Sequence, residues 1–266
     1  MRFEDIVYST SDRIATIRID RPESLNAFRR QTVDELIAAF EEAGDDPAIG
    51  AVILTGTGER AFCVGGDVKD FGPGGYRGAS WTGIGLRVEL LHRVIRAAPK
   101  PVIAAINGYA IGGGNVLQVV CDLSIAAERA TFGQVGPRYG SFDAGYGTAY
   151  LARLVGERKA REIWFLCRRY TAREALEMGL INAVVPDAEL QIAARAWATE
   201  ALGLSPTALK MIKASFNADT EHVAGIGQLA FGALGLYYGT AEASEGHVAL
   251  AEKRAPRYPE FRRTPE

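Results

Sequence analysis

Cysteine is scarce in this sequence, and its few copies are far apart. Cys63, Cys121 and Cys167 are the only three in 266 residues. An odd number at wide spacing argues against a disulfide framework and favours a reducing compartment, so we expect a cytoplasmic protein. Cys63 lies in a glycine-rich turn, where a thiol could react. A small buried apolar side chain is nevertheless the more common role for such a residue.

An excess of positive charge is also missing. The chain has 30 basic and 32 acidic residues and a formal net charge of -2. No basic surplus is left to neutralise phosphates, so nucleic acid is not an expected partner. No uninterrupted apolar run reaches the roughly 20 residues that span a bilayer, and residues 1–5 do not resemble a signal peptide. A membrane partner is therefore not expected either.

Several patterns that carry chemistry are absent. His92, His222 and His247 are widely separated and show no metal-ligand spacing, so we expect no metal site. The sequence has no Gly-x-Ser-x-Gly elbow, no Walker A motif and no Gly-x-Gly-x-x-Gly that follows a strand. Covalent serine hydrolysis and dinucleotide binding therefore lack support.

Two glycine turns that follow buried strands are the most informative features present. The apolar run 101–106 leads to Gly112-Gly113-Gly114, with a helix expected from Val116. The apolar run 51–54 leads to a second turn at residues 61–67, which contains Gly65 and Gly66. Glycines let a ligand approach bare backbone N–H groups, and a helix N-terminus favours negative charge. Two such turns could form an oxyanion hole, although glycines alone equally fit ordinary tight turns.

The order of the predicted elements indicates an α/β fold. A strand at 13–20, a helix at 33–43 capped by Thr32 and the strand at 51–54 form a β-α-β unit with a right-handed crossover. One further strand is expected at 123–127. Further helices are expected at 86–97, 148–155, 157–168 and 171–178. The glycine-rich stretch 72–80 is predicted as a loop that could cover a site.

The last third of the chain is largely helical. Residues 184–186 close the globular part, so we divide the chain into a core at 1–186 and a C-terminal helical region at 187–266. No linker separates the two. The helical region should therefore pack on the same body or on a neighbouring subunit.

The loop 132–147 combines aromatic residues with hydrogen-bonding side chains. Asp143 follows Ser141 there and could serve as a general base. The alternative is that Asp143 caps the helix near Thr148 or bonds to its own turn, and spacing alone favours that structural role. Tyr237-Tyr238 on a C-terminal helix is likewise more typical of packing than of chemistry.

Combined, the turns at 61–67 and 112–114, with Cys121-Asp122-Leu123 and Phe132-Gly133-Gln134, resemble the crotonase (enoyl-CoA hydratase/isomerase) superfamily over nearly the whole chain. The resemblance implies a spiral of ββα units, C-terminal helices that trimerise, and a homotrimer or homohexamer. It also implies an acyl-CoA substrate and no cofactor beyond the CoA moiety of that substrate. The thioester oxygen would receive N–H groups from Gly66 and Gly113. The implied CoA-binding residues are Ala61, Cys63, Gly65, Asp67 and Lys253.

The departures from the family pattern are informative. Enoyl-CoA hydratases carry two glutamates, and the corresponding positions here hold Val116 and Gly136. Neither residue can move a proton. Simple hydration of an enoyl-CoA is therefore not expected.

The loop 133–147 resembles a narrower branch, which contains 1,4-dihydroxy-2-naphthoyl-CoA synthase and 2-ketocyclohexanecarboxyl-CoA hydrolase. Residues 140–143 and 160–164 match both enzymes, and Tyr238 matches a tyrosine that reaches the site from the C-terminal region. The bicarbonate-binding version of the synthase is matched by Gln134, Gly136 and Trp164. The resemblance therefore implies a site for an anion such as bicarbonate or chloride.

Other positions separate the two enzymes. Phe71 stands where the synthase has a longer polar loop with a substrate-binding arginine, and Asn115 and the segment 83–96 are more similar to the hydrolase. Residues 142–144 are instead similar to the synthase, and Val68 fits neither. The balance favours the hydrolase.

The expected reaction is the opening of a cyclic β-ketoacyl-CoA. Asp143, positioned by Ser141, would activate water, and Tyr238 would donate a hydrogen bond to the developing alkoxide. Gly66 and Gly113 would stabilise the thioester enolate. The alternatives are naphthoate synthase chemistry, in which the ring closes, and a non-catalytic member that only binds acyl-CoA.

Overall fold

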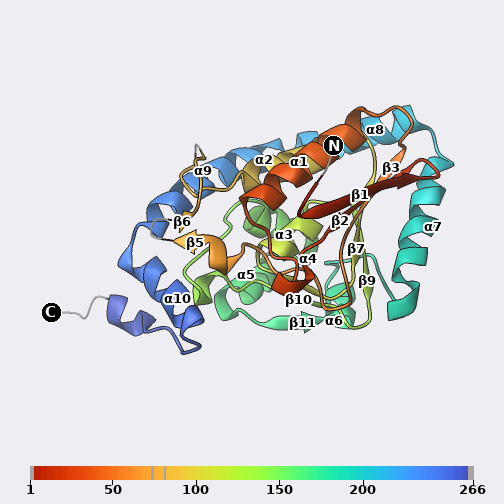
Figure 1. Cartoon of the computed structure of the whole chain (residues 1–266). Coiled ribbons are helices and arrows are strands. Elements are labelled where there is room, and N and C mark those ends of the chain that lie inside the picture. The colour runs from red at the N-terminus through yellow and green to blue at the C-terminus, as the bar shows by residue number, and fades with distance from the viewer. Residues whose placement is uncertain (1–2, 73–74, 81, 263–266) are drawn as a thin grey trace.

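Two sheets organise the chain in the computed structural model, which describes residues 3–72, 75–80 and 82–262 (Figure 1). The larger sheet has the strand order β1-β2-β3-β7-β9-β12. Its first two strands are antiparallel, and each later neighbour is parallel. The strands are β1 (Ile6–Ser11), β2 (Ile14–Ile19), β3 (Ala51–Gly56), β7 (Val102–Ile106), β9 (Leu123–Ala127) and β12 (Ala183–Val185).

The smaller sheet positions the glycine turns. Its order is β11-β10-β8-β4, and its strands are β4 (Ala61–Cys63), β8 (Tyr109–Ile111), β10 (Thr131–Gly133) and β11 (Arg169–Thr171). The pairs β3/β4, β7/β8 and β9/β10 each send one strand to each sheet, which produces the predicted spiral. Because β4 and β8 are parallel neighbours, the turns that follow them meet at one edge.

Both faces of the larger sheet are covered. Ile53 and Ile103 pack against α7 (Leu190–Leu202), which flanks the sheet at the right of Figure 1. Val52 and Leu54 point the other way, into the main core with α1 (Arg30–Asp45). Strands buried on both faces lack polar alternation, which explains the continuous apolar runs. The C-terminal region therefore begins by packing on this chain's own sheet.

The remaining helices pack on the smaller sheet, on α1 or on one another. They are α2 (Val88–Ala97), α3 (Gly113–Val119), α4 (Leu151–Val155), α5 (Glu157–Leu166), α6 (Ala172–Glu177), α8 (Pro206–Asp219), α9 (Glu221–Tyr238) and α10 (Ala241–Ala251). One π-helical turn, Tyr146–Tyr150, leads into α4. Short 3-10 turns occupy Pro22–Ser24, Val68–Asp70, Gly136–Arg138, Asp187–Glu189 and Tyr258–Phe261. Within the described part of the chain, no helix has both the length and the apolarity needed to cross a bilayer.

Two predicted helix starts are wrong by three residues. α1 begins at Arg30, and Thr32 in its first turn accepts a hydrogen bond from the Arg29 N–H instead of preceding the helix. α3 begins at Gly113 rather than Val116, so glycine forms its first turn. In both cases the helical backbone begins three residues before the first apolar residue on which the prediction was based.

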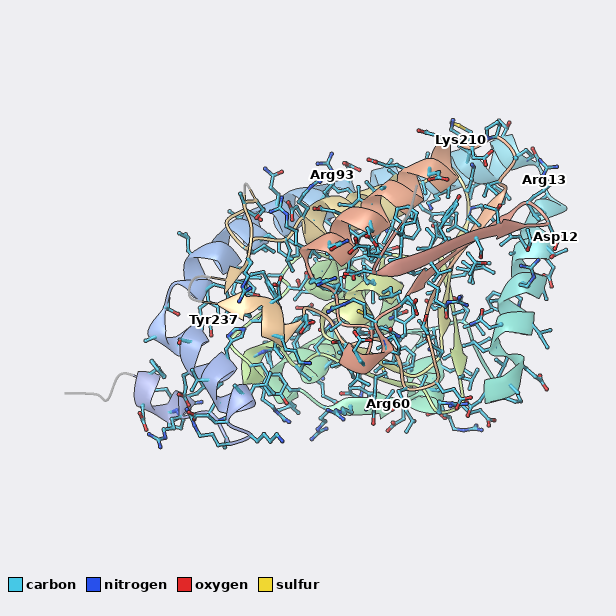
Figure 2. The ribbon with its side chains drawn as sticks, viewed as in Figure 1. Asp12, Arg13, Arg60, Arg93, Lys210 and Tyr237 are labelled. Carbon is cyan, nitrogen blue, oxygen red and sulfur yellow. The ribbon has the colours of Figure 1, made fainter. Side chains whose placement is uncertain are left out.

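The N-terminal strand and the glycine-rich segment also differ from expectation. β1 was not predicted. In the turn between β1 and β2 lies Asp12 (Figure 2), whose carboxylate oxygen is 2.7 Å from a guanidinium nitrogen of Arg195 on α7. Within the predicted loop, β5 (Phe71–Gly72) pairs with β6 (Gly75–Tyr76). Positions 73 and 74 of that loop lie outside the described residues.

Candidate active site

The two predicted glycine turns touch. Gly65 has a φ of +90°, a left-handed conformation that favours glycine, and a Cβ built there would lie 3.0 Å from the Gly113 nitrogen. A side chain at this position would therefore separate the turns. The absence of Cβ lets the main chain after β4 approach the first residue of α3.

The N–H groups of Gly66 and Gly113 both remain available. Phe28 donates its N–H to the Gly65 carbonyl and accepts from the Asp67 N–H, both at 2.8 Å. In this parallel bridge the N–H of the middle residue, Gly66, points away from Phe28. Gly113 opens α3, where the first N–H groups lack acceptors within the helix. Neither N–H donates a hydrogen bond within the described ranges.

Both glycines line a cavity of about 140 Å³. Ser141, Asp143 and Tyr238 line the same cavity, so the sequence-predicted catalytic residues are brought together. Its apolar walls include Phe28, Ile84, Leu86, Phe231 and Leu234. A mostly apolar cleft with a few converging polar groups is typical of a small-molecule site.

Asp143 has a structural role as well as a place in the cavity. Its Oδ1 accepts hydrogen bonds from the N–H groups of Gly145 and Gly147, each at 3.1 Å. Oδ1 therefore has the structural role that the sequence allowed as an alternative, in which the aspartate bonds to its own turn. Oδ2 has no hydrogen bond to any residue that the structure describes, which leaves it available to a water or substrate proton.

Ser141 and Tyr238 meet across the cavity. Their hydroxyl oxygens are 2.9 Å apart. Burial raises the pKa of Tyr238 to about 12, a rise that the Ser141 hydrogen bond opposes and the Asp143 charge increases. The phenol is therefore neutral near pH 7 and can act as a hydrogen-bond donor.

The sequence analysis missed Tyr76. Its ring packs edge-on against those of Phe71 and Tyr238, and it lines the cavity. A Cβ at Gly66 would lie 2.0 Å from the Tyr76 hydroxyl oxygen, which places that hydroxyl beside the Gly66 turn. Burial raises the pKa of Tyr76, so this group is also a neutral phenol. An aromatic residue inside a glycine-rich stretch was the available signal.

His247 completes one side of the cavity. Its ring stacks on that of Phe71 with centroids 3.5 Å apart, and its Nδ1 bonds to the Ala243 carbonyl. Burial lowers the pKa of His247, so the imidazole is neutral near pH 7. A histidine ring in the wall of this cavity was not predicted.

Of the predicted CoA-binding residues, only Gly65 is among the described residues that line the cavity. Ala61 and Cys63 are buried in β4. The Ala61 carbonyl already accepts hydrogen bonds from the side-chain amides of Asn26 and Asn107. Burial raises the pKa of Cys63 to about 12, which keeps the thiol protonated and argues against a reactive role. Lys253 follows α10 in a left-handed conformation, with a φ of +56°. The CoA contacts stay predictions.

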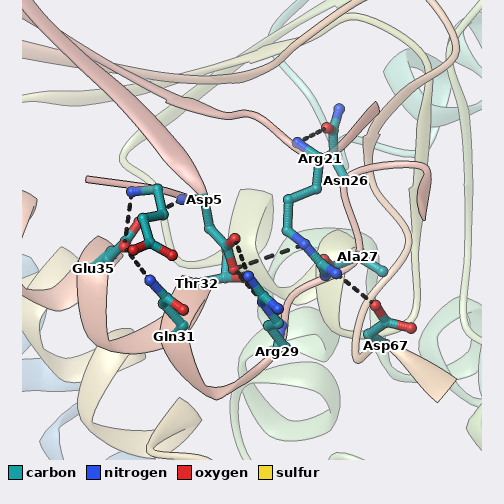
Figure 3. Close-up of polar contacts among 10 residues, drawn as sticks. Asp5, Arg21, Asn26, Ala27, Arg29, Gln31, Thr32, Glu35 and Asp67 are labelled. Atoms are coloured by element: carbon teal, nitrogen blue, oxygen red, sulfur yellow. Dashed lines mark hydrogen bonds and ion pairs between the residues drawn. The ribbon is translucent and has the colours of Figure 1, made fainter. Parts of the chain in front are cut away.

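Asp67 belongs to a buried polar network rather than to the cavity wall (Figure 3). One carboxylate oxygen pairs with Arg21 at 2.8 Å, and the other accepts from the Lys69 N–H at 3.0 Å. Arg21 also approaches Asp5, which binds Arg29 through two hydrogen bonds of 2.8 Å. The network ties the turn that carries Gly66 to the N-terminal segment.

The predicted anion-binding residues differ in what they offer. Both polar atoms of the Gln134 side chain are buried with no hydrogen-bond partner in the described part of the chain. The Trp164 indole N–H, by contrast, donates to the Gly147 carbonyl. Of these two side chains, Gln134 is therefore the one whose polar group could bind an anion. It lines the cavity together with Gly136. Anion binding stays a prediction.

Comparison with known proteins identifies the family of this chain. The family model described as enoyl-CoA hydratase/isomerase matches residues 9–261. The chain belongs to the enoyl-CoA hydratase/isomerase family. Among solved structures, the chain is similar to an enoyl-CoA hydratase from Mycobacterium avium subsp. paratuberculosis K-10, with 28% identity, a TM-score of 0.85, and coverage of 96% of this chain and 99% of that one.

A second solved structure shows a similar degree of likeness. An enoyl-CoA hydratase/isomerase from Pseudoalteromonas atlantica T6c is 27% identical with a TM-score of 0.83, over 96% of this chain and 99% of that chain. The crotonase fold and acyl-CoA processing are therefore shared with the enoyl-CoA hydratase/isomerase family. Within the described ranges, no group of three or more His, Cys, Asp or Glu residues could hold a metal ion.

Proposed function

We propose that this member of the enoyl-CoA hydratase/isomerase family opens the ring of a cyclic β-ketoacyl-CoA by adding water, in the reverse of a Dieckmann condensation. One observation carries the proposal. Asp143, whose Oδ2 has no hydrogen bond to a described residue, lines the same cavity as the Gly66 and Gly113 N–H groups and the Ser141–Tyr238 pair. In the proposed reaction these groups act as the base, as the hydrogen-bond donor to the alkoxide and as the donors to the enolate oxygen.

The positions of the hydratase glutamates support a reaction other than hydration. Val116 is fully buried on α3. A Cβ at Gly136 would lie 2.5 Å from the Ser141 carbonyl oxygen, so the loop that places Ser141 leaves no room for a side chain there. The carboxylate pair expected of a hydratase is thus replaced by one aspartate and two hydroxyls.

The proposed steps balance atoms and charge. Asp143 takes a proton from water as the hydroxide adds to the ring ketone, and Tyr238, oriented by Ser141, donates a hydrogen bond to the alkoxide. The bond between that carbon and the α-carbon then breaks, and its electrons form the thioester enolate. Gly66 and Gly113 stabilise the enolate oxygen. Protonated Asp143 then returns the proton that it took from water to the α-carbon, which restores its carboxylate, and the former ketone carbon is released as a carboxylic acid.

Ring closure on an o-succinylbenzoyl-CoA-like substrate is the second candidate. The specific observation in its favour is the unpaired Gln134 amide, because the resemblance links Gln134 to the bicarbonate-binding synthase. Closure would use the same enolate in the opposite direction. A member that binds acyl-CoA without turnover is the third candidate.

Assays with 2-ketocyclohexanecarboxyl-CoA and o-succinylbenzoyl-CoA separate these candidates. We expect turnover of the first thioester and at least a ~10²-fold loss in Asp143→Asn, the usual scale of a lost general base. Asp219→Asn is the matched control, because Asp219 is an exposed aspartate on α8. Turnover of the second thioester alone, or binding without turnover, would refute ring opening.

Assembly into a homotrimer or homohexamer is part of the same proposal. Phe216 on α8 and Leu229 and Leu236 on α9 expose 72%, 78% and 81% of their surfaces. Large exposed apolar side chains that gather on neighbouring helices are typical of interaction surfaces. Light scattering coupled to size exclusion should give a mass of three or six chains, and a monomer would contradict it.

A further inference from the structure

His92 is a buried histidine to which the proposed reaction assigns no role. It lies on α2, is fully buried, and neither ring nitrogen has a hydrogen-bond partner among the described residues. Its neighbours are the Tyr146 ring, edge-on at 5.8 Å, and the Phe231 ring at 6.1 Å. Buried polar groups normally find a partner, so two unpaired nitrogens indicate a water or ligand site.

The imidazole lines a second cavity, of about 210 Å³. Polar groups in its wall come from three elements, and they are Glu89, His92, Arg93, Tyr146, Glu221 and Gln228. A water occupies roughly 30 Å³ in the liquid, so the space holds several waters with polar partners. Arg93 is exposed on the outer surface (Figure 2), which indicates that the cavity reaches solvent on this side.

This cavity lies behind the turn that holds Asp143. Gly145 and Gly147 donate to Asp143, and Tyr146 between them packs against His92. Phe231 lines both cavities. The turn at 145–147 and the Phe231 ring therefore lie between the proposed base and the second cavity.

The electrostatic environment connects the two residues. Burial lowers the pKa of His92, and the Asp143 charge partly opposes that decrease. The other charged or titratable groups around the imidazole are Glu89 and Arg93 on α2, Tyr146 in the π-helical turn and Glu221 on α9. A neutral imidazole has one N–H and one lone pair, so it can accept a proton at one nitrogen and release one from the other.

We propose that His92 and its cavity form a water-filled path that exchanges protons and water between Asp143 and solvent behind the acyl pocket. The inference rests on the proposed ring opening. That reaction consumes one water per turnover and yields a carboxylic acid that releases a proton near pH 7. A bound thioester fills the front cavity, so an entrance on the other side of Asp143 lets both exchanges proceed with the substrate in place. His92 is thus a positioning and relay residue that acts through Asp143.

The kinetic test uses the full-length enzyme and the thioester that it turns over. His92→Phe keeps an aromatic ring between Tyr146 and Phe231 but removes both nitrogens. We expect a decrease in kcat of about 10-fold or more with unchanged KM and a larger solvent isotope effect. His92→Gln should recover little of the rate, because its amide can hold a water but cannot pass a proton from one atom to another. His222→Phe, at an exposed position on α9, is the control. An unchanged kcat and pH profile in a folded His92→Phe enzyme would overturn the inference.

A second measurement requires no substrate. In protein with ¹⁵N-labelled histidine, the His92 ring N–H should exchange with water within seconds despite its burial, and Asp143→Asn should lower the His92 pKa. An N–H protected for hours, or a titration that Asp143→Asn leaves unchanged, would overturn the path. Failure of ring opening would appear separately, as no turnover of the cyclic thioester by the wild-type enzyme.

Discussion

The hydroxyl oxygens of Ser141 and Tyr238 lie 2.9 Å apart, although 97 positions of sequence separate them. Ser141 belongs to the loop after β10, and Tyr238 is the last residue of α9. The C-terminal helices therefore contribute part of the wall of the candidate cavity. Changes that displace α9 should affect chemistry as well as stability.

Tyr238→Phe should decrease kcat by about 10- to 100-fold, because the phenol supplies a hydrogen bond to charge that develops in the transition state. Ser141→Ala should cost less, since it only loosens the orientation of Tyr238. The double variant should be no worse than Tyr238→Phe, because the two groups act as a unit. Steady-state kinetics on all three variants provides the measurement, and additive losses would argue against a coupled pair.

Gly66→Ala should reduce kcat by ~10²–10³-fold, the scale of one lost oxyanion donor. The added Cβ would meet the Tyr76 hydroxyl oxygen at 2.0 Å and displace the turn that aims the N–H. Gly72→Ala is the matched control, because a Cβ there meets nothing within 4 Å. Equal activity in the two variants would show that the Gly66 turn does not hold the charge.

Asp67→Asn should destabilise the fold by about 1.5–3 kcal/mol, the usual contribution of a buried hydrogen bond to a charged group. The Arg21 and Asp67 side chains are only 11% and 7% exposed. Asp12→Asn is the matched control, because Asp12 pairs with Arg195 at the surface, where the two side chains are 81% and 39% exposed. There the loss in the free energy of unfolding should be less than about 1 kcal/mol. Denaturant unfolding measures both values. Similar losses in the two variants would contradict a special role for the buried pair.

Glu245 should contribute to stability at moderate pH and lose that contribution in acid. Hydrogen bonds from Arg254 and from the Arg257 N–H lower the pKa of Glu245 from 4.5 to about 2. A lowered folded-state pKa gives stabilisation that is present above pH 4.5 and disappears as the pH falls towards 2. The Tm difference between wild type and Glu245→Gln should therefore shrink over that window, whereas a constant difference would refute the linkage.

Sequence patterns predicted the parts of the fold that depend on local chemistry. The apolar runs at 51–54 and 101–106 correspond to β3 and β7, because strands covered on both faces need no polar alternation. The turns after β4 and β8 were recognised from their glycines. The family resemblance then brought Ser141, Asp143 and Tyr238 into one cavity, a grouping that no local pattern could give.

Other features depend on contacts between distant segments. Asp67 was expected to bind CoA, but its partner Arg21 lies 46 residues away and was visible only in the folded chain. Tyr76 was hidden in a segment whose glycine content favoured a loop. His92 fits the apolar periodicity of α2, so its unpaired nitrogens emerge only when the residues around it are known.

The neighbouring positions of β4 and β8 have an evolutionary consequence. The Gly66 and Gly113 amides, which we propose hold the enolate, depend on main-chain placement in one small sheet. The proposed base, the two hydroxyls and the apolar cavity walls come mostly from loops and from α9. Substitutions in those loops can change which thioester is accepted, or which bond is broken, without altering the charge-holding centre. A lineage built on this sheet can therefore diversify its reactions one loop at a time.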